Sequence, residues 1–245
     1  ELAKIYVLLD EIQDANVRTF LRCGFSNILK NCSIWSQKST KPTRDFSKKI
    51  PAPIPTFLRQ IKQMAKRNRK FYELLKKSGY LDIPTHAYCK DARNLPAKSD
   101  TAQLIVTSPP YVTSYEYADL HQLPSLWFGY LSDLPEFRKK FIGSAYKSRD
   151  KIDLKSRLAH KIVEQLGENK KGREVKHYFA DMLETFEETK RVLKTGGKAC
   201  IVIGNTQFQG VDILNAEVFQ EQFENIGFET HNVIHREIPS KMLPS

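Results

Sequence analysis

The chain has 245 residues, of which 40% are hydrophobic and 27% are charged, enough apolar material for the core of a large globular domain. The net charge of +11 favours a polyanionic partner, with nucleic acid as the first interpretation, and charge alone does not separate DNA from RNA. No apolar run is long enough to cross a bilayer, and residues 1–20 lack the pattern of a signal peptide, so we expect a cytoplasmic protein without membrane attachment.

The four cysteines, Cys23, Cys32, Cys89 and Cys200, do not form a C-x-x-C pair, so neither zinc nor another metal is expected. Cys89 and Cys200 lie in apolar, strand-like runs, which predicts reduced cysteines in the core. Reduced cysteines are typical of the cytosol.

The first 80 residues predict helices joined by a basic loop. Apolar side chains recur at helical spacing in residues 1–32. Residues 36–56 are rich in Lys, Ser, Thr and Pro and predict an extended loop. Thr56 is expected to cap a helix that runs to about Ser78. We interpret residues 1–80 as a helical segment for docking and DNA contact. The candidates for phosphate contact are the loop 38–49, which is favoured, and helices 59–77 and 138–176.

Residues 81–245 alternate between strands and helices, which predicts an α/β domain with an open sheet and right-handed crossovers. The run Leu104-Ile105-Val106 is continuously apolar and suits a strand buried on both faces of a parallel sheet. The expected strands are 84–89, 103–107, 198–204 and 229–236, and the expected helical regions are 115–131, 133–172, 174–193 and 214–226.

The strand at 103–107 ends in Ser108-Pro109-Pro110-Tyr111. Ligands of open α/β sheets bind at the carboxyl edge of the strands. Consecutive prolines have fixed φ angles and no N–H, so their carbonyls form a stiff group of acceptors. Together with the Ser108 hydroxyl they can accept hydrogen bonds from an exocyclic amino group, while Tyr111 offers a flat face on which an unpaired base can stack.

Such hydrogen bonds would activate an aromatic amine, whose lone pair is delocalised into its ring. Drawing the nitrogen toward tetrahedral geometry localises that pair for in-line attack on a sulfonium methyl group, and holding the two reactants in line lowers the barrier by several kcal/mol. The base must first leave the duplex, which costs a few kcal/mol and calls for a stacking partner.

The sequence Thr107-Ser108-Pro109-Pro110-Tyr111 resembles the catalytic motif of S-adenosylmethionine-dependent DNA amino-methyltransferases that modify cytosine N4 or adenine N6. The serine form is more typical of the cytosine-N4 group. The resemblance spans roughly residues 84–237 and implies a Rossmann-like fold. It extends to Tyr115–Asp119 with Leu126-Trp127, and to His177–Met182, Arg191–Gly197 and Cys200–Asn205.

The resemblance also implies site residues. Ser108, Pro109, Pro110 and Tyr111 are the expected catalytic residues. Asp91, which follows the strand at 84–89, is expected to contact the adenine of the donor S-adenosylmethionine, and Thr107 is assigned to the same cofactor. The expected substrate-binding residues, which could equally be core residues, are Tyr115, Tyr117, Asp119 and His121.

The Gly-rich turn on which the methyl donor normally sits, Phe-x-Gly-x-Gly or similar, is absent from this sequence. The predicted sheet therefore lacks its first donor-binding strand. We expect a second polypeptide to carry the Gly-rich motif and complete a split enzyme, with truncation as the other explanation.

Four alternatives stay open on the residues alone. The first is adenine-N6 methylation, or methylation of RNA. The second is a non-catalytic DNA-binding subunit that keeps the fold. In the third, Pro109-Pro110 merely ends a strand. The fourth, cytosine-C5 methylation, is weak because no cysteine follows a proline. A role in a restriction-modification system is implied by the resemblance.

Overall fold

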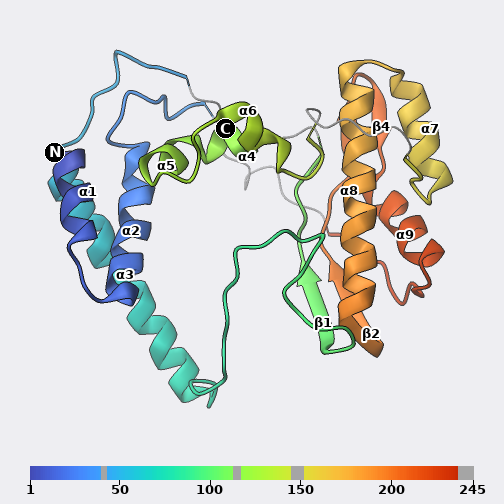
Figure 1. The fold of residues 1–245 in the computed structure, drawn as a ribbon, viewed down its shortest axis with the longest axis horizontal. Coiled ribbons are helices and arrows are strands. Elements are labelled where there is room, and N and C mark those ends of the chain that lie inside the picture. The colour runs from blue at the N-terminus through green and yellow to red at the C-terminus, as the bar shows by residue number, and fades with distance from the viewer. Residues whose placement is uncertain (40–42, 113–116, 145–151, 237–245) are drawn as a thin grey trace. The chain divides into compact units, whose positions relative to one another are not determined.

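The computed structural model describes residues 1–39, 43–112, 117–144 and 152–236 (Figure 1). Contacts divide the chain into two compact units, which are described separately. Unit 1 consists of Glu1–Tyr88 and Tyr115–Arg138, and unit 2 consists of Cys89–Ser114 and Lys139–Ser245. The functional division at residues 80 and 81 stays a prediction.

Unit 1 is helical, and its helices are short apart from α2 and α3. The Asp14 side chain caps α2 by accepting from the backbone amides of Asn16 and Val17. Phe25 of α2 is fully buried and contacts Trp127 edge to face. The helices are α1 (Leu2–Asp10), α2 (Ala15–Leu29), α3 (Pro53–Lys77), α4 (Tyr117–Leu120), α5 (Gln122–Trp127) and α6 (Leu134–Lys139).

Helix α3 begins at Pro53, so the predicted N-cap at Thr56 is wrong. The Thr56 hydroxyl donates to the carbonyl of Ala52 from within the first turn. Proline is tolerated there because the first amides of a helix have no partner within the helix. None of the helices in the described parts of the chain has the length and apolarity needed to cross a bilayer.

The sequence predicts an extended basic loop after α2. In the structure this loop folds back on the end of α2. The Lys48 ammonium donates to the carbonyls of Lys30, Ser33 and Trp35 at 2.6, 2.8 and 2.7 Å. A bridge between Trp35 and Arg44 closes the loop. Burial lowers the pKa of Lys48. This side chain, counted above among the candidates for phosphate contact, is therefore engaged by the loop.

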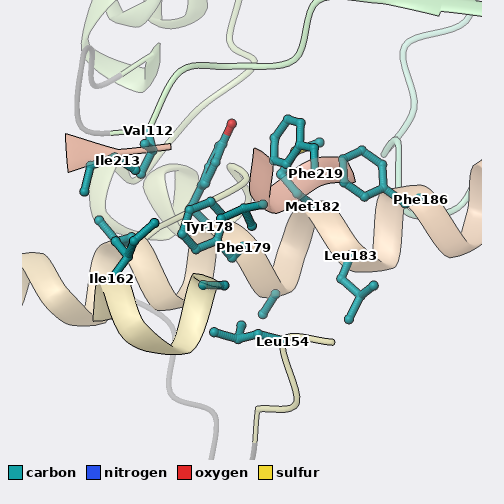
Figure 2. Packing of buried hydrophobic residues seen from close by; sticks show 14 of the residues in the cluster. Val112, Leu154, Ile162, Tyr178, Phe179, Met182, Leu183, Phe186, Ile213 and Phe219 are labelled. Atoms are coloured by element: carbon teal, nitrogen blue, oxygen red, sulfur yellow. The ribbon is translucent and has the colours of Figure 1, made fainter. Parts of the chain in front are cut away.

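Unit 2 is a mixed α/β structure in which β1 (Ala102–Thr107) pairs in parallel with β2 (Leu193–Ile201). Helix α8 (Lys170–Val192) supplies more of the buried core than any other element, and Figure 2 shows Tyr178, Phe179 and Met182 of this helix packed with Phe219. The other elements are α7 (Arg157–Leu166), the antiparallel pair β3 (Thr206–Phe208) and β4 (Val211–Ile213), and α9 (Asn215–Asn225).

One face of the β1–β2 pair is uncovered, which contradicts the expected burial on both faces. Leu104 and Val106 are 60% and 65% exposed. Val106 is in register with Cys200, which is exposed as well. The reason is that the structure, over the residues it describes, pairs β1 with β2 alone and places its core on the other face.

Two predicted strands are not formed. Residues 84–89 and 229–236 have no strand assignment and are exposed. A strand needs a neighbour for its backbone hydrogen bonds, and neither segment has one among the described residues. Cys89 and Cys200 are unpaired, as predicted, but they are exposed and not in the core. The hairpin β3–β4 was missed, although Gln209-Gly210 between two short alternating runs is a turn signal.

Candidate active site

The Ser-Pro-Pro-Tyr segment lies directly after β1, at the carboxyl edge of the parallel pair. Ser108 is exposed, Pro109 is buried, and Pro110 and Tyr111 are half-buried. Val112 is anchored in the core. The Ser108 hydroxyl makes no hydrogen bond to the described part of the chain. The Ser108 hydroxyl is thus exposed to solvent on a segment that Val112 anchors in the core.

Tyr178 of α8 fixes the second proline. Its hydroxyl donates to the Pro110 carbonyl at 2.7 Å, and its side chain is almost fully buried. Figure 2 shows the hydroxyl pointing away from α8. This bond takes one of the two lone pairs of the Pro110 carbonyl and fixes the position of the second proline. The roles predicted for the Ser108 hydroxyl and the proline carbonyls toward an amine stay predictions.

The Tyr111 ring lies against the backbone that follows β2. A Cβ on Gly204 would stand 3.5 Å from Tyr111 Cε1, in van der Waals contact. The Asn215 side chain donates to the Gly204 carbonyl at 3.0 Å and fixes this backbone in place. The Asn205 side chain accepts from the Ala216 amide in the first turn of α9 at 3.0 Å.

Asp181 ties two further loops to α8. It is fully buried and accepts from Arg93 Nη1 at 2.9 Å and from the Gly143 amide at 2.8 Å. Arg93 also pairs with Asp91, which, more than Asp181, raises the pKa of its guanidinium. A buried carboxylate is stable when charge and hydrogen bonds compensate it, as they do here.

Gly143 packs directly on α8. A Cβ on this residue would stand 3.0 Å from Cβ of Tyr178, and its φ is +73°. Both the space and the backbone conformation require glycine. His177 Nδ1 lies 3.2 Å from the Ser144 carbonyl. Residues 177–181 of α8 therefore hold the three loops at residues 93, 110 and 143–144. The sequence signal for these contacts is the presence of two polar residues, His177 and Asp181, in an apolar helix face.

The residues assigned to the methyl donor form an incomplete site. Both carboxylate oxygens of Asp91 accept hydrogen bonds from Arg93, at distances of 2.6–2.9 Å. The Thr107 carbonyl accepts from the Val202 amide at 2.9 Å within the sheet. The sequence has no Gly-rich turn to cradle the donor. The residues present therefore do not fit S-adenosylmethionine by themselves, and the cofactor roles of Asp91 and Thr107 stay predictions.

The four residues predicted to bind the base belong to the stretch after the motif. Asp119 of α4 forms an ion pair with Arg138 at 2.6 Å. Tyr117 is half-buried and His121 is exposed. Tyr115 lies outside the described residues. Because Tyr117, Asp119 and His121 belong to unit 1 and Ser108 to unit 2, their role at the base stays a prediction.

We predict that Tyr178→Phe lowers the free energy of unfolding by about 1 kcal/mol, since the ring packing stays while one hydrogen bond is lost. Urea unfolding followed by tyrosine fluorescence measures this change. Tyr72→Phe, on the exposed part of α3, is the matched control and should leave the midpoint unchanged. Equal effects of the two substitutions would contradict the anchoring of Pro110 by Tyr178.

A parallel strand that delivers Ser-Pro-Pro-Tyr to the edge of an α/β sheet is the arrangement expected of an amino-methyltransferase. Residues 102–245, more than half of the chain, match the family described as DNA methylase, N6_N4_Mtase. The chain belongs to this family of amino-methyltransferases. S-adenosylmethionine is the methyl donor of the family.

Two curated relatives bear the same kind of name. The chain is 22% identical, over 97% of its own length and 57% of the relative, to the Type II methyltransferase M.MvaI of Kocuria varians. It is 25% identical, over 56% of its length and 33% of the relative, to the Type II methyltransferase M.AvaI of Nostoc sp.. The chain thus spans between a third and three fifths of these relatives. No solved structure matches the chain.

Proposed function

We propose that this chain provides the base-binding half of a DNA methyltransferase that modifies the exocyclic amino group of a flipped base, with cytosine N4 as the favoured acceptor. The observation that carries the proposal is the exposed Ser108 hydroxyl, free of hydrogen bonds to the described chain, on a proline segment anchored by Tyr178. Membership of the DNA methylase family supports the reaction class.

The residues of this chain hold and orient the amine. The Ser108 hydroxyl and the Pro109 carbonyl accept its two N–H bonds, which localises the nitrogen lone pair. Rigid acceptors lower the barrier because they need no reorganisation as the reaction proceeds. Tyr111 stacks on the base, which has left the duplex. S-adenosylmethionine, when bound by the complete enzyme, would supply the electrophilic methyl group, and the methylated amine would lose one proton to solvent.

The serine at position 108 favours cytosine N4 over adenine N6, because serine is more typical of the cytosine-N4 enzymes that the motif resembles. Tyr117, Asp119 and His121, together with Tyr115, are proposed to line the base pocket. Adenine N6 is the second candidate, supported by a family description that covers both amines.

A second polypeptide that carries the Gly-rich donor motif is proposed to complete a Rossmann-like sheet. The apolar face formed by Leu104, Val106 and Val202 is exposed, and β1 has an unpaired edge within the described chain. An unpaired strand edge is a template for pairing with further strands. The names of the relatives, both Type II methyltransferases, support a place in a restriction-modification system.

The product identifies the acceptor. The chain, combined with the polypeptide that carries the donor motif, is incubated with S-adenosylmethionine and duplex DNA, and the nucleosides are analysed by mass spectrometry. N4-methylcytosine is the expected product, and the chain alone should yield almost none. N6-methyladenine instead would assign the second candidate, and unmodified DNA that still binds the complex would support a non-catalytic subunit.

A further inference from the structure

Helix α3 concentrates the positive charge of the chain. Its 25 residues carry eight cations against one carboxylate, Glu73, a net charge of +7 out of +11 for the whole chain. All eight are exposed, and no residue of the helix is buried. None of these cations forms an ion pair with a described residue. The cations are Arg59, Lys62, Lys66, Arg67, Arg69, Lys70, Lys76 and Lys77.

Most of the charge lies on one side of the helix. Lys62, Lys66 and Lys70 are four residues apart, so their side chains lie one above another. Four residues rise about 6 Å along the axis, so the three ammonium groups form a row along roughly 12 Å. By helical periodicity, Arg59 and Lys77 extend the row at its two ends. We call these five residues the basic stripe.

The opposite side of α3 is occupied by the unit itself along the first half of the helix. Ile61 and Met64 pack on Gly24 of α2, where Ile61 Cδ1 approaches so closely that a Cβ would collide with it. Phe57 packs against the core of unit 1. This apolar side is therefore not available to a lipid surface over that length, whereas the basic stripe is presented to solvent.

We infer that the basic stripe binds the phosphate backbone of duplex DNA without reading its sequence. DNA carries one negative charge per about 1.7 Å of its axis, so a row of ammonium groups about 6 Å apart meets phosphates along its whole length. Flexible lysines match phosphates as point charges. The stripe would hold the duplex while another part of the enzyme selects the base. The choice of DNA as the polyanion rests on the function proposed above.

The test compares two triple variants of the full chain that lose equal charge. K62Q/K66Q/K70Q removes the centre of the stripe, and K4Q/K98Q/K194Q removes three exposed lysines that lie outside α3 and outside the other candidates for phosphate contact. Glutamine resembles lysine in helix propensity, so α3 is retained, which circular dichroism checks. Binding of a fluorescent duplex is followed by anisotropy at several KCl concentrations.

The stripe variant should bind at least about tenfold more weakly at 0.1 M KCl. Its plot of log affinity against log salt should be shallower by up to about 3, near 0.9 per lost phosphate contact. The control should keep the slope of the unchanged chain. Equal losses in both variants would overturn the inference, because DNA would then respond to net charge alone.

A vesicle arm separates DNA from a membrane surface. Sedimentation with phosphatidylserine vesicles should show no loss that is specific to the stripe variant. If that variant lost vesicle binding while keeping DNA binding, the inference would be overturned. Ser108→Ala should keep the salt slope, so a failure of the proposed methylation and a failure of the stripe give different results.

Discussion

Replacing Asp181 with alanine is expected to lower the free energy of unfolding by about 3–5 kcal/mol, the cost of breaking a buried ion pair. The carboxylate is fully buried and joins Arg93 to the Gly143 amide. Its removal leaves the partly buried Gly143 amide without this acceptor, and Arg93, which is mostly buried, keeps Asp91 and a long bond to the Lys140 carbonyl. Urea unfolding monitored by circular dichroism measures the change.

The matched control lies on the same helix. Glu187 forms an ion pair with Lys155 at 2.8 Å, and both side chains are more than a third exposed. Glu187→Ala should cost well under 1 kcal/mol, because exposed pairs contribute little. If Asp181→Ala cost no more than this control, Asp181 would not anchor the loops at 93 and 143, and the support described for the motif would be wrong.

The sequence predicts those elements of the fold whose signals are local. Helix α8 buries the face on which Val175, Phe179 and Phe186 recur, so its periodicity alone locates it. The predicted strand before Ser108 is confirmed as β1. Its signal is local, since an apolar run is followed directly by two prolines that end the strand. The small parallel pair of β1 and β2 agrees with the predicted α/β class.

The two predicted strands that do not form would need neighbouring strands that cannot be identified from the sequence. Residues 84–89 and 229–236 have strand-like composition, but a strand forms only when another backbone accepts and donates its hydrogen bonds. The predicted burial of Leu104 and Val106 was wrong for the same reason, since an apolar run predicts burial but does not identify the segment that would cover it.

The sequence predicts the chemical groups of the candidate site, but it does not predict the contacts that hold them in place. The reading of Ser108 depends on residue type and on position after a strand, both visible in sequence. The bond from Tyr178 to Pro110 joins residues 68 positions apart, and Gly143 reaches α8 across 38 positions. Pairings at such separations are set by tertiary packing, so only the polar residues within the apolar face of α8 hinted at them.

Ser108→Ala is expected to lower methyl transfer by the assembled enzyme by about 10²–10³-fold, the usual effect of removing one preorganised polar group from a transition state. The hydroxyl is one of the two acceptors proposed to orient the amine, the other being the Pro109 carbonyl. Single-turnover transfer of a tritiated methyl group to duplex DNA measures the rate.

The same substitution should leave stability unchanged, because Ser108 is exposed and makes no hydrogen bond to the described chain. DNA affinity should stay largely intact, because contacts to the phosphate backbone supply most of it. Ser108→Asn, which keeps a side-chain acceptor at this position, should retain more activity than alanine. Unchanged turnover in Ser108→Ala would instead make this chain a silent DNA-binding subunit, since an enzyme that grips the amine through this hydroxyl must slow down when it is lost.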